Sequence, residues 1–264
     1  MIPAAVDYVR AGSVEEALEA LAQPDAKLLA GGQSLLPAMK LRIARPSVVV
    51  DIGGLGLGGI EERNGDLVIG ALTTWEELAR SEALRRPALA ALPECAAGIG
   101  DLQVRNLGTI GGSLAHADPA SDMPAVAIAL GARLSVRSAS GDRTLDAAEL
   151  ALGPFTTSLG EGELITEVLI PVPPPGSGSA YMAVEHPASG FALAGAAALV
   201  GADGTARVAV TGVAAAPFLL EGELDDAELF GDRFAPVKYR RVLARTMVDR
   251  ATALAEQRAK EDTK

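Results

Sequence analysis

The chain has 264 residues, of which 49% are hydrophobic and 22% charged, and its 23 basic and 34 acidic side chains give a formal net charge of −11. This length can bury a substantial core and fits two domains. The acidic balance, without a cluster of lysine or arginine, argues against nucleic acid or an anionic membrane as a partner. Aromatic residues make up only 3%, so the core has to be built mainly from alanine, leucine, valine and isoleucine.

One cysteine and two histidines restrict the inorganic chemistry of the chain. An iron–sulfur cluster takes about four cysteine or histidine ligands, and a structural zinc ion needs a similar set, so we expect neither here. Cys95 lies in an alanine-rich segment and is interpreted as a small buried side chain. A lone cysteine forms no internal disulfide, and no signal-peptide pattern or membrane-length apolar run is evident, which favours the cytoplasm.

The first fifty residues alternate helix and strand signals. Ser13 and Glu16 form a capping-box pattern that predicts a helix from residue 14. Apolar runs predict strands at residues 27–30 and 47–52, and Ser34 is expected to cap a short helix between them. We therefore predict a compact α/β unit over residues 1–55.

The following segment begins with a glycine-rich link whose residues 54–59 match the pattern G-x-G-x-x-G. A dinucleotide site of that type needs a helix next. Residues 61–66 instead predict a polar turn, so a Rossmann site is not expected. Further on, the sequence predicts a strand near residues 67–72, helices over 75–97 behind a second capping box, a helix from residue 121, a hairpin over 133–145 and a strand at 163–170.

A proline-rich and then Gly/Ser-rich stretch, residues 172–179, is the clearest linker in the chain. Behind it, strands are predicted near residues 181–185, 193–200 and 206–213, followed by a long helix at about 235–261. We therefore predict a boundary near residue 175 and a smaller C-terminal domain over residues 176–264.

Two Gly-Gly loops, residues 30–35 and 109–114, carry the strongest chemical signal. Each passes through two glycines into a small hydroxyl residue and leads towards a helix. Glycine lets the backbone approach an anion closely and point its N–H groups at it. The first loop alone could equally be an ordinary strand-to-helix turn, whereas the second carries more signal because a polar string follows it. The pair favours one diphosphate.

A polar string, residues 116–122, follows the second loop. Its carboxylates suit sugar or polyol hydroxyls, although Asp118 and Asp122 could equally be turn and helix-cap residues. His116 alone is more typical of a packed or surface histidine than of a catalytic one. The sequence contains no G-x-S-x-G, P-loop or H-E-x-x-H motif, so redox chemistry would require a bound organic cofactor.

These motifs, together with residues 162–171, 186–192 and 239–243, resemble the FAD-binding (medium) subunit of the molybdenum hydroxylases of the carbon-monoxide-dehydrogenase and xanthine-dehydrogenase type. The resemblance covers essentially the whole chain. It implies an α+β architecture: an FAD-binding fold of the vanillyl-alcohol-oxidase (PCMH) type over residues 1–175, with α/β subdomains at about 1–55 and 56–175. A smaller domain of sheet plus helix, residues 176–264, completes it.

The resemblance also implies a set of residues that bind FAD. The two loops would hold the diphosphate, Asp122 the ribityl or sugar part, and a few apolar and aromatic side chains the flavin ring. Glu185 stands where some relatives have a lysine near the pyrimidine edge, which leaves the electron acceptor open. The implied residues are Leu29, Ala30, Gly31, Gly32, Gln33, Ser34, Leu35, Ile99, Thr109, Gly111, Gly112, Ser113, His116, Asp118, Asp122, Ile165, Glu185 and Phe191.

By the same resemblance, the flavin would receive electrons from [2Fe-2S] clusters on a small subunit, which are supplied by a molybdopterin site on a large subunit. The complex would be a dimer of heterotrimers, and this chain would contain neither a metal site nor a catalytic residue of its own. Two alternatives remain at this point. One is a free-standing flavin oxidoreductase with His116 or His186 as its base, and the other is a flavin-free scaffold protein.

Overall fold

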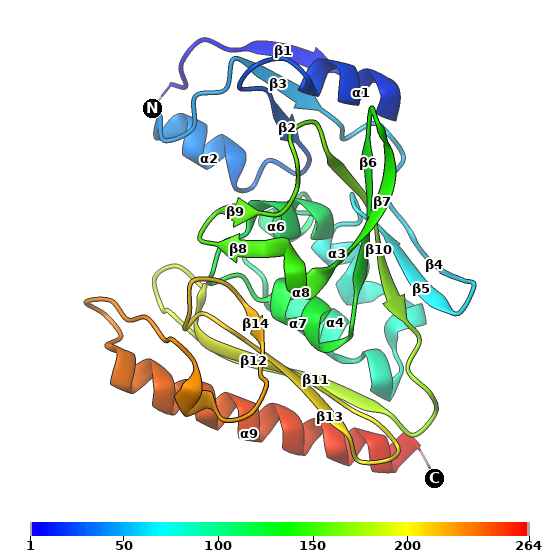
Figure 1. Cartoon of the computed structure of the whole chain (residues 1–264), viewed down its shortest axis with the longest axis vertical. Coiled ribbons are helices and arrows are strands. Elements are labelled where there is room, and N and C mark those ends of the chain that lie inside the picture. The colour runs from blue at the N-terminus through cyan, green and yellow to red at the C-terminus, as the bar shows by residue number, and fades with distance from the viewer. Residues whose placement is uncertain (1, 263–264) are drawn as a thin grey trace.

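The computed structural model describes residues 2–262, which form three units stacked along the long axis (Figure 1). The first unit is a parallel sheet in the order β1-β3-β2 with two helices. Its elements are β1 (Asp7–Arg10), α1 (Val14–Leu21), β2 (Lys27–Leu29), α2 (Leu35–Lys40) and β3 (Val48–Asp51). Val48 and Val50 of the central strand pack against Ala17 and Leu18 of α1, so this unit has a small core of its own.

The second unit is an antiparallel five-stranded sheet in the order β4-β5-β10-β6-β7. Helices α3, α4, α6 and α7 pack on one of its faces, where Leu67, Ile69 and Leu134 join the largest core of the chain. Its main elements are β4 (Ile60–Arg63), β5 (Asp66–Gly70), α3 (Trp75–Arg80), α4 (Ala91–Gly98), α5 (Leu102–Arg105), α6 (Ile110–His116), α7 (Met123–Ala129), β6 (Arg133–Ser138), β7 (Gly141–Asp146) and β10 (Leu164–Pro171).

Short elements complete this unit. Two 3₁₀ turns, Glu82–Leu84 and Pro87–Leu89, join α3 to α4. The short helix α8 (Ala147–Leu150) leads into a hairpin of β8 (Ala151–Gly153) and β9 (Thr156–Thr157). Within this hairpin, the Phe155 amide donates to the Ala117 carbonyl at 2.9 Å, so the hairpin is fastened to the end of α6.

The third unit is an antiparallel sheet in the order β11-β12-β13-β14, crossed on one face by the 26-residue helix α9 (Figure 1). The strands are β11 (Gly178–Glu185), β12 (Ala192–Val200), β13 (Ala206–Thr211) and β14 (Phe218–Leu219), a 3₁₀ turn spans Leu224–Asp226, and α9 is Val237–Asp262. Alanines of α9, including Ala251 and Ala255, are buried against alanines of β11 and β12. Small side chains let the helix lie close to the sheet, which explains how a chain poor in aromatic residues fills this core.

Most predicted elements are confirmed, and the second capping box forms as expected: the Thr74 hydroxyl accepts from the Glu77 amide at 3.3 Å, and the Glu77 carboxylate accepts from the Thr74 amide at 2.7 Å. Ser13 caps α1 by accepting from the Glu16 amide at 3.1 Å, but the Glu16 carboxylate accepts from the Gly12 amide, so the first predicted capping box forms only in part. Ser34 occupies the N-cap position of α2 but makes no capping hydrogen bond with its side chain, so that prediction was wrong. Cys95 is buried, as predicted.

The predicted polar turn at residues 61–66 was wrong. Ile60–Arg63 forms the edge strand β4, and the turn is confined to Asn64 and Gly65, with φ of 55° and 85°. Three of the four β4 side chains are exposed, so the strand carries no alternating apolar pattern. The Asn-Gly pair is the preferred hairpin turn and was the available signal. A strand, rather than a helix, follows residues 54–59, which confirms that they are not a Rossmann fingerprint.

The five-stranded sheet ends at Pro171 and the next sheet begins at Gly178. The connection is therefore shorter than the predicted linker, because Gly178 and Ser179 already belong to β11. The boundary that we predicted near residue 175 falls within this connection and stays a prediction.

Candidate functional site

The first Gly-Gly loop joins β2 to α2 and presents unpaired backbone donors. Gly32, at φ 72°, turns the chain, and the Gln33 side-chain amide donates to the Gly31 carbonyl at 3.1 Å. Across the described residues, no acceptor takes the backbone N–H groups of residues 31–34. Because amides that leave water need another partner, this loop offers several adjacent donors to an anion.

The second loop forms the start of α6, and its backbone amides already donate hydrogen bonds within the protein. Ile110 donates to the Thr73 carbonyl at 3.1 Å, Gly111 to the Ala71 carbonyl at 2.9 Å, and Gly112 to the Thr109 hydroxyl at 3.2 Å. A β-carbon on Gly111 would lie 2.6 Å from the Ala71 β-carbon, so this glycine is required for packing. What the loop offers to a ligand is therefore two hydroxyl groups. The Ser113 hydroxyl has no protein partner among the described residues, and the Thr109 hydroxyl, which accepts from Gly112, still has a proton to donate.

The two loops meet in space. A β-carbon on Gly31 would overlap the peptide between Leu107 and Gly108, coming within 2.5 Å of the Leu107 carbonyl carbon. A β-carbon on Gly112 would lie 3.8 Å from the Ala30 side chain. The convergence that the spacing predicted is therefore present, and the contact with Leu107, which precedes the second motif, was not foreseen.

The polar string is folded against the C-terminal sheet. The Thr211 hydroxyl donates to the Ser121 carbonyl at 2.6 Å, and the Gly212 amide donates to the Pro119 carbonyl at 3.0 Å. Asp118 accepts from the Ala120 amide at 2.9 Å, which makes it a turn residue. The His116 ring packs on Phe155, with centroids 5.2 Å apart.

Asp122, at the end of the string, is partly buried and accepts a hydrogen bond from the Tyr181 hydroxyl. Burial raises the pKa of its carboxyl from 3.8 to about 6, with smaller contributions from the negative charges of Glu185 and Asp118, while the Tyr181 hydrogen bond opposes the rise. Burial also raises the pKa of the neighbouring Cys95 thiol. A carboxylate in this setting favours a ligand that brings hydrogen-bond donors.

The residues predicted for the flavin ring occupy three different settings. Ile99 follows α4 and is half-buried, and Ile165 is buried on β10 in the same core. Glu185, at the end of β11, reaches towards Gly98, next to Ile99. Phe191 is 46% exposed and closes the hairpin between β11 and β12, where its carbonyl accepts from the His186 amide at 2.8 Å.

The predicted residues come from all three units. Leu29 and Leu35 bracket the first loop at the end of β2 and the start of α2. Glu185 lies beside Gly98, which precedes Ile99, and its negative charge acts on Asp122. Tyr181, which reaches Asp122 from the C-terminal sheet, was missed because nothing in its local sequence indicates the partner.

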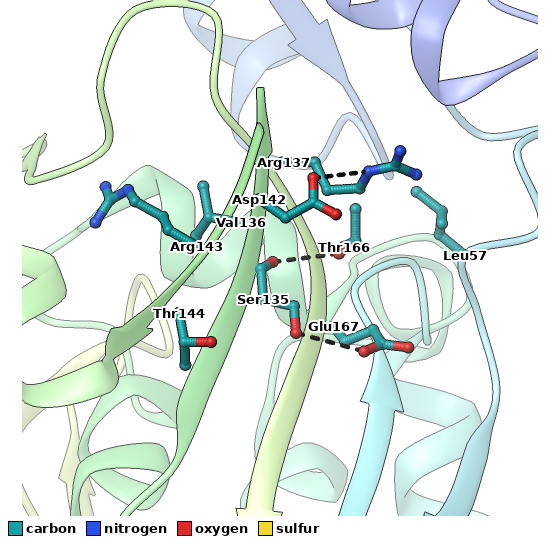
Figure 2. A pocket seen from close by; sticks show the side chains of 9 residues that line it. All are labelled: Leu57, Ser135, Val136, Arg137, Asp142, Arg143, Thr144, Thr166 and Glu167. Carbon is teal, nitrogen blue, oxygen red and sulfur yellow. Dashed lines mark hydrogen bonds and ion pairs between the residues drawn. The ribbon is translucent and has the colours of Figure 1, made fainter. Parts of the chain in front are cut away.

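A pocket of about 390 Å³ lies elsewhere, on the outer face of the five-stranded sheet beside the glycine-rich link (Figure 2). Its charged side chains are already neutralised: Arg143 pairs with Glu163 at 2.7 Å and points away from Arg137, and Glu167 accepts from Arg63 at 2.8 Å. None of the predicted site residues lines it. The lining residues are Leu57, Ser135, Val136, Arg137, Asp142, Arg143, Thr144, Thr166 and Glu167.

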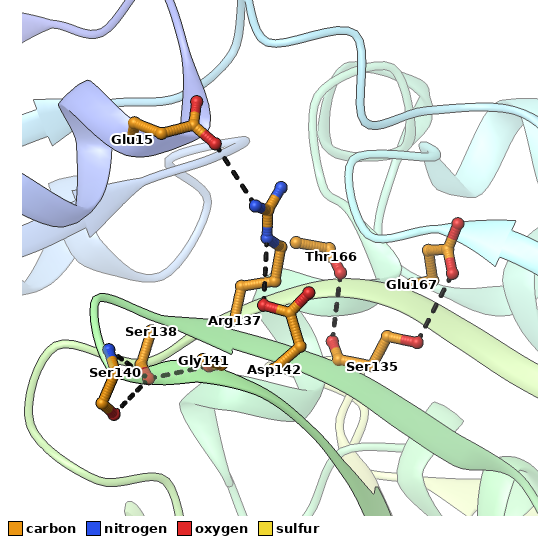
Figure 3. Close-up of polar contacts among 9 residues, drawn as sticks. All are labelled: Glu15, Ser135, Arg137, Ser138, Ser140, Gly141, Asp142, Thr166 and Glu167. Atoms are coloured by element: carbon orange, nitrogen blue, oxygen red, sulfur yellow. Dashed lines mark hydrogen bonds and ion pairs between the residues drawn. The ribbon is translucent and has the colours of Figure 1, made fainter.

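Arg137 of β6 also links the first two units. Figure 3 shows its guanidinium between Glu15 of α1 and Asp142 of β7, at 3.2 Å from each carboxylate. Both carboxylates are about two-thirds exposed or more, at 71% and 68%. Exposed pairs of this kind contribute little to stability, so this contact fastens the units only weakly.

Comparison with known proteins gives a consistent assignment. Residues 4–173 match the family described as the FAD binding domain in molybdopterin dehydrogenase. The chain is 38% identical to the 6-hydroxypseudooxynicotine dehydrogenase complex subunit alpha of Paenarthrobacter nicotinovorans, over 98% of this chain and 97% of that protein. It is 36% identical to the carbon monoxide dehydrogenase medium chain of Afipia carboxidovorans, over 98% and 100%.

Solved structures agree. A chain in the crystal structure of Cu,Mo-CO dehydrogenase superposes with a TM-score of 0.92 at 36% identity, covering 98% of this chain and all of that one. Unpaired amides in the first loop and the absence of a β-carbon where the loops meet suit the diphosphate of FAD. The chain belongs to the family of FAD-binding medium subunits of molybdenum hydroxylases.

Proposed function

We propose that this chain is the FAD-carrying electron-transfer subunit of a molybdenum hydroxylase complex. The observation that carries the proposal is the junction of the two Gly-Gly loops, where the free amides of residues 31–34 lie beside α6. Two comparisons support the proposal. The relatives are of nearly the same length and are similar across the whole chain, and the family model matches residues 4–173.

In this proposal the first loop binds the diphosphate through its amides, and Thr109 and Ser113 add hydroxyl groups from the second loop. Asp122 binds the ribityl or sugar part, and Ile99, Ile165, Glu185 and Phe191 surround the ring. FAD supplies the ability to exchange both single electrons and electron pairs. The protein contributes position, a low dielectric and hydrogen bonds.

Electrons would reach this chain from partner subunits. No group of three or more histidine, cysteine, aspartate or glutamate side chains in the described part of the chain could hold a metal ion. The proposed partners are a small subunit with [2Fe-2S] clusters and a large molybdopterin subunit, assembled as a dimer of heterotrimers. No helix among the described residues is long and apolar enough to cross a membrane, and we keep the cytoplasm as the proposed location because the chain has a single, unpaired cysteine.

The histidines do not favour a free-standing oxidoreductase. His116 packs against Phe155, and His186 lies edge-on to Phe234 with centroids 5.1 Å apart. Packing against a phenylalanine ring therefore explains the position of each histidine side chain. The electron-transfer role is the better supported of the two functions.

Two experiments test the proposal. The purified chain is titrated with FAD, and we expect one flavin per chain with quenched fluorescence and a shifted absorption band. Separately, the tagged chain is recovered from its own organism, and we expect iron–sulfur and molybdopterin subunits to accompany it. Failure to bind FAD, alone or within the recovered complex, would refute the cofactor assignment, and recovery of the flavoprotein without those subunits would refute the role in the complex.

A further inference from the structure

Tyr181 joins the C-terminal sheet to the polar string of the FAD-binding unit. It lies on β11, and its hydroxyl donates to Oδ1 of Asp122, which directly precedes α7. Both side chains are partly buried. Apart from the backbone amide of Asp122 itself, no other hydrogen-bond donor to this carboxylate is found among the described residues. Tyr181 is therefore the one other residue that holds the carboxylate, and it does so at Oδ1, so that Oδ2 has no partner from another residue in the described part of the chain.

The neighbouring strand makes room for this contact. A β-carbon on Gly195 of β12 would lie 2.5 Å from the Tyr181 hydroxyl oxygen and 3.0 Å from the Thr211 methyl group. Most other residues of β12 are alanines, and glycine replaces alanine where the tyrosine crosses. Glycine in a strand interior weakens the strand. Its presence at position 195 therefore indicates that the space beside it is needed for the Tyr181 side chain to reach Asp122.

We propose that Tyr181 is a positioning residue for FAD: it fixes the rotamer of Asp122 by holding Oδ1, so that Oδ2 is directed to accept a hydrogen bond from a hydroxyl group of the bound polyol. This inference rests on the proposed FAD site. It adds a role for the C-terminal domain, which would hold the carboxylate ready before the cofactor arrives. A ligand pays less entropy when its partner group is already fixed.

The charges around Asp122 make this donor important. Glu185 from β11 and Asp118 from the same string are both acidic, and Cys95 from α4 is neutral at ordinary pH because burial raises the pKa of its thiol. Within the described part of the chain, no basic side chain contributes to holding the Asp122 carboxylate in its ionised form. The Tyr181 hydroxyl is thus its main side-chain donor, and a hydroxyl group of the cofactor would be the second.

The test compares Tyr181→Phe with Tyr8→Phe. Tyr8 also donates to an aspartate, Asp51, but does so in the first unit at an exposed position, which makes it a matched control. FAD affinity is measured by fluorescence titration of the full chain between pH 5 and pH 8, with thermal melts to verify folding. We expect Tyr181→Phe to weaken FAD binding about tenfold at pH 7.5 and Tyr8→Phe to leave it unchanged.

The pH profile distinguishes positioning from a merely structural role. In the wild type, affinity should rise as the pH passes through about 6, where Asp122 ionises. Tyr181→Phe should move this midpoint to higher pH, because the hydroxyl that stabilises the carboxylate is gone. Gly195→Ala, which obstructs the tyrosine without removing it, should produce a shift in the same direction.

A folded Tyr181→Phe protein with wild-type affinity and an unchanged midpoint would overturn the inference. If the two Tyr→Phe variants lost affinity equally, the effect would be general and the inference would again fail. Absence of FAD binding by the wild type would instead refute the proposed function, so the two failures are distinguishable.

Discussion

Gly31 and Leu107 lie so close that no side chain fits between them: a β-carbon on Gly31 would stand 2.5 Å from the Leu107 carbonyl carbon and closer still to its oxygen. The contact is between backbone and backbone, so rotation of a side chain cannot relieve it. It fixes the first Gly-Gly loop against the segment that enters the second. The distance between the two halves of the proposed diphosphate site is thereby set by one missing methyl group.

Gly31→Ala should therefore separate the loops. We expect a loss of about 3 kcal/mol or more in the free energy of unfolding, because overpacking against backbone forces the chain to move, and a loss of FAD binding. Urea unfolding and flavin titration measure the two effects. Gly153→Ala is the control, since a β-carbon there would meet nothing within 4 Å, and equal effects of the two substitutions would contradict this account.

Asp122→Asn should stabilise the chain in the absence of FAD at neutral pH. The folded-state pKa of Asp122, about 6, lies above its ordinary value of 3.8, so the folded chain binds this proton more tightly than the unfolded chain. The stability from protonation is complete below pH 3.8 and is lost as the pH rises through about 6. We expect the variant to be more stable by about 1–2 kcal/mol at pH 7.5 and equal to the wild type near pH 4.

Urea unfolding at the two pH values checks this prediction. A variant that is equally stabilised at both would show that ionisation of Asp122 is not the cause. The same variant should bind FAD more weakly than the wild type, since a charged acceptor is lost. Gain of stability with loss of function is common for residues of binding sites.

Glu185→Lys should raise the reduction potential of the bound flavin. Glu185 lies beside Gly98, which precedes Ile99, and replacing its negative charge by a positive one favours the reduced, anionic flavin. Since about 1.4 kcal/mol corresponds to about 30 mV for a two-electron couple, we expect a rise on the order of 30 mV in a redox titration. Glu19→Lys, on the exposed side of α1, is the control for charge alone, and an unchanged potential in Glu185→Lys would place Glu185 away from the ring.

Two arginines that link units should differ in importance. Arg137 pairs with two exposed carboxylates, whereas Arg258 of α9 is 18% exposed and donates both to Glu94 of α4 and to the Ser179 carbonyl at 2.7 Å. We expect Arg137→Ala to cost less than about 1 kcal/mol of unfolding free energy and Arg258→Ala about 2–3 kcal/mol. Urea unfolding of both variants checks the order, and a larger effect at Arg137 would contradict it.

Local sequence signals predicted those elements whose cause is local. The N-cap hydrogen bond of Ser13 and the capping box at Thr74 depend on residues three positions apart. The apolar strands of the sheets follow from burial of one or both faces. The edge strands β1 and β4 escaped prediction because their side chains are mostly exposed. Pairing with a neighbouring strand, which lies elsewhere in the sequence, is what makes them strands.

The sequence by itself determined the family, the two Gly-Gly loops and the lack of ligands for a metal cluster, because residue type and short spacing are sufficient for each. Only the tertiary structure decided which backbone amides are available to a ligand. Those of the first loop have no acceptor among the described residues, whereas those of the second donate to Ala71, Thr73 and Thr109. The tertiary structure alone also placed Tyr181 on Asp122, across 59 residues of chain. Contacts of this kind arise when sheets and helices pack, so no local sequence pattern predicts them.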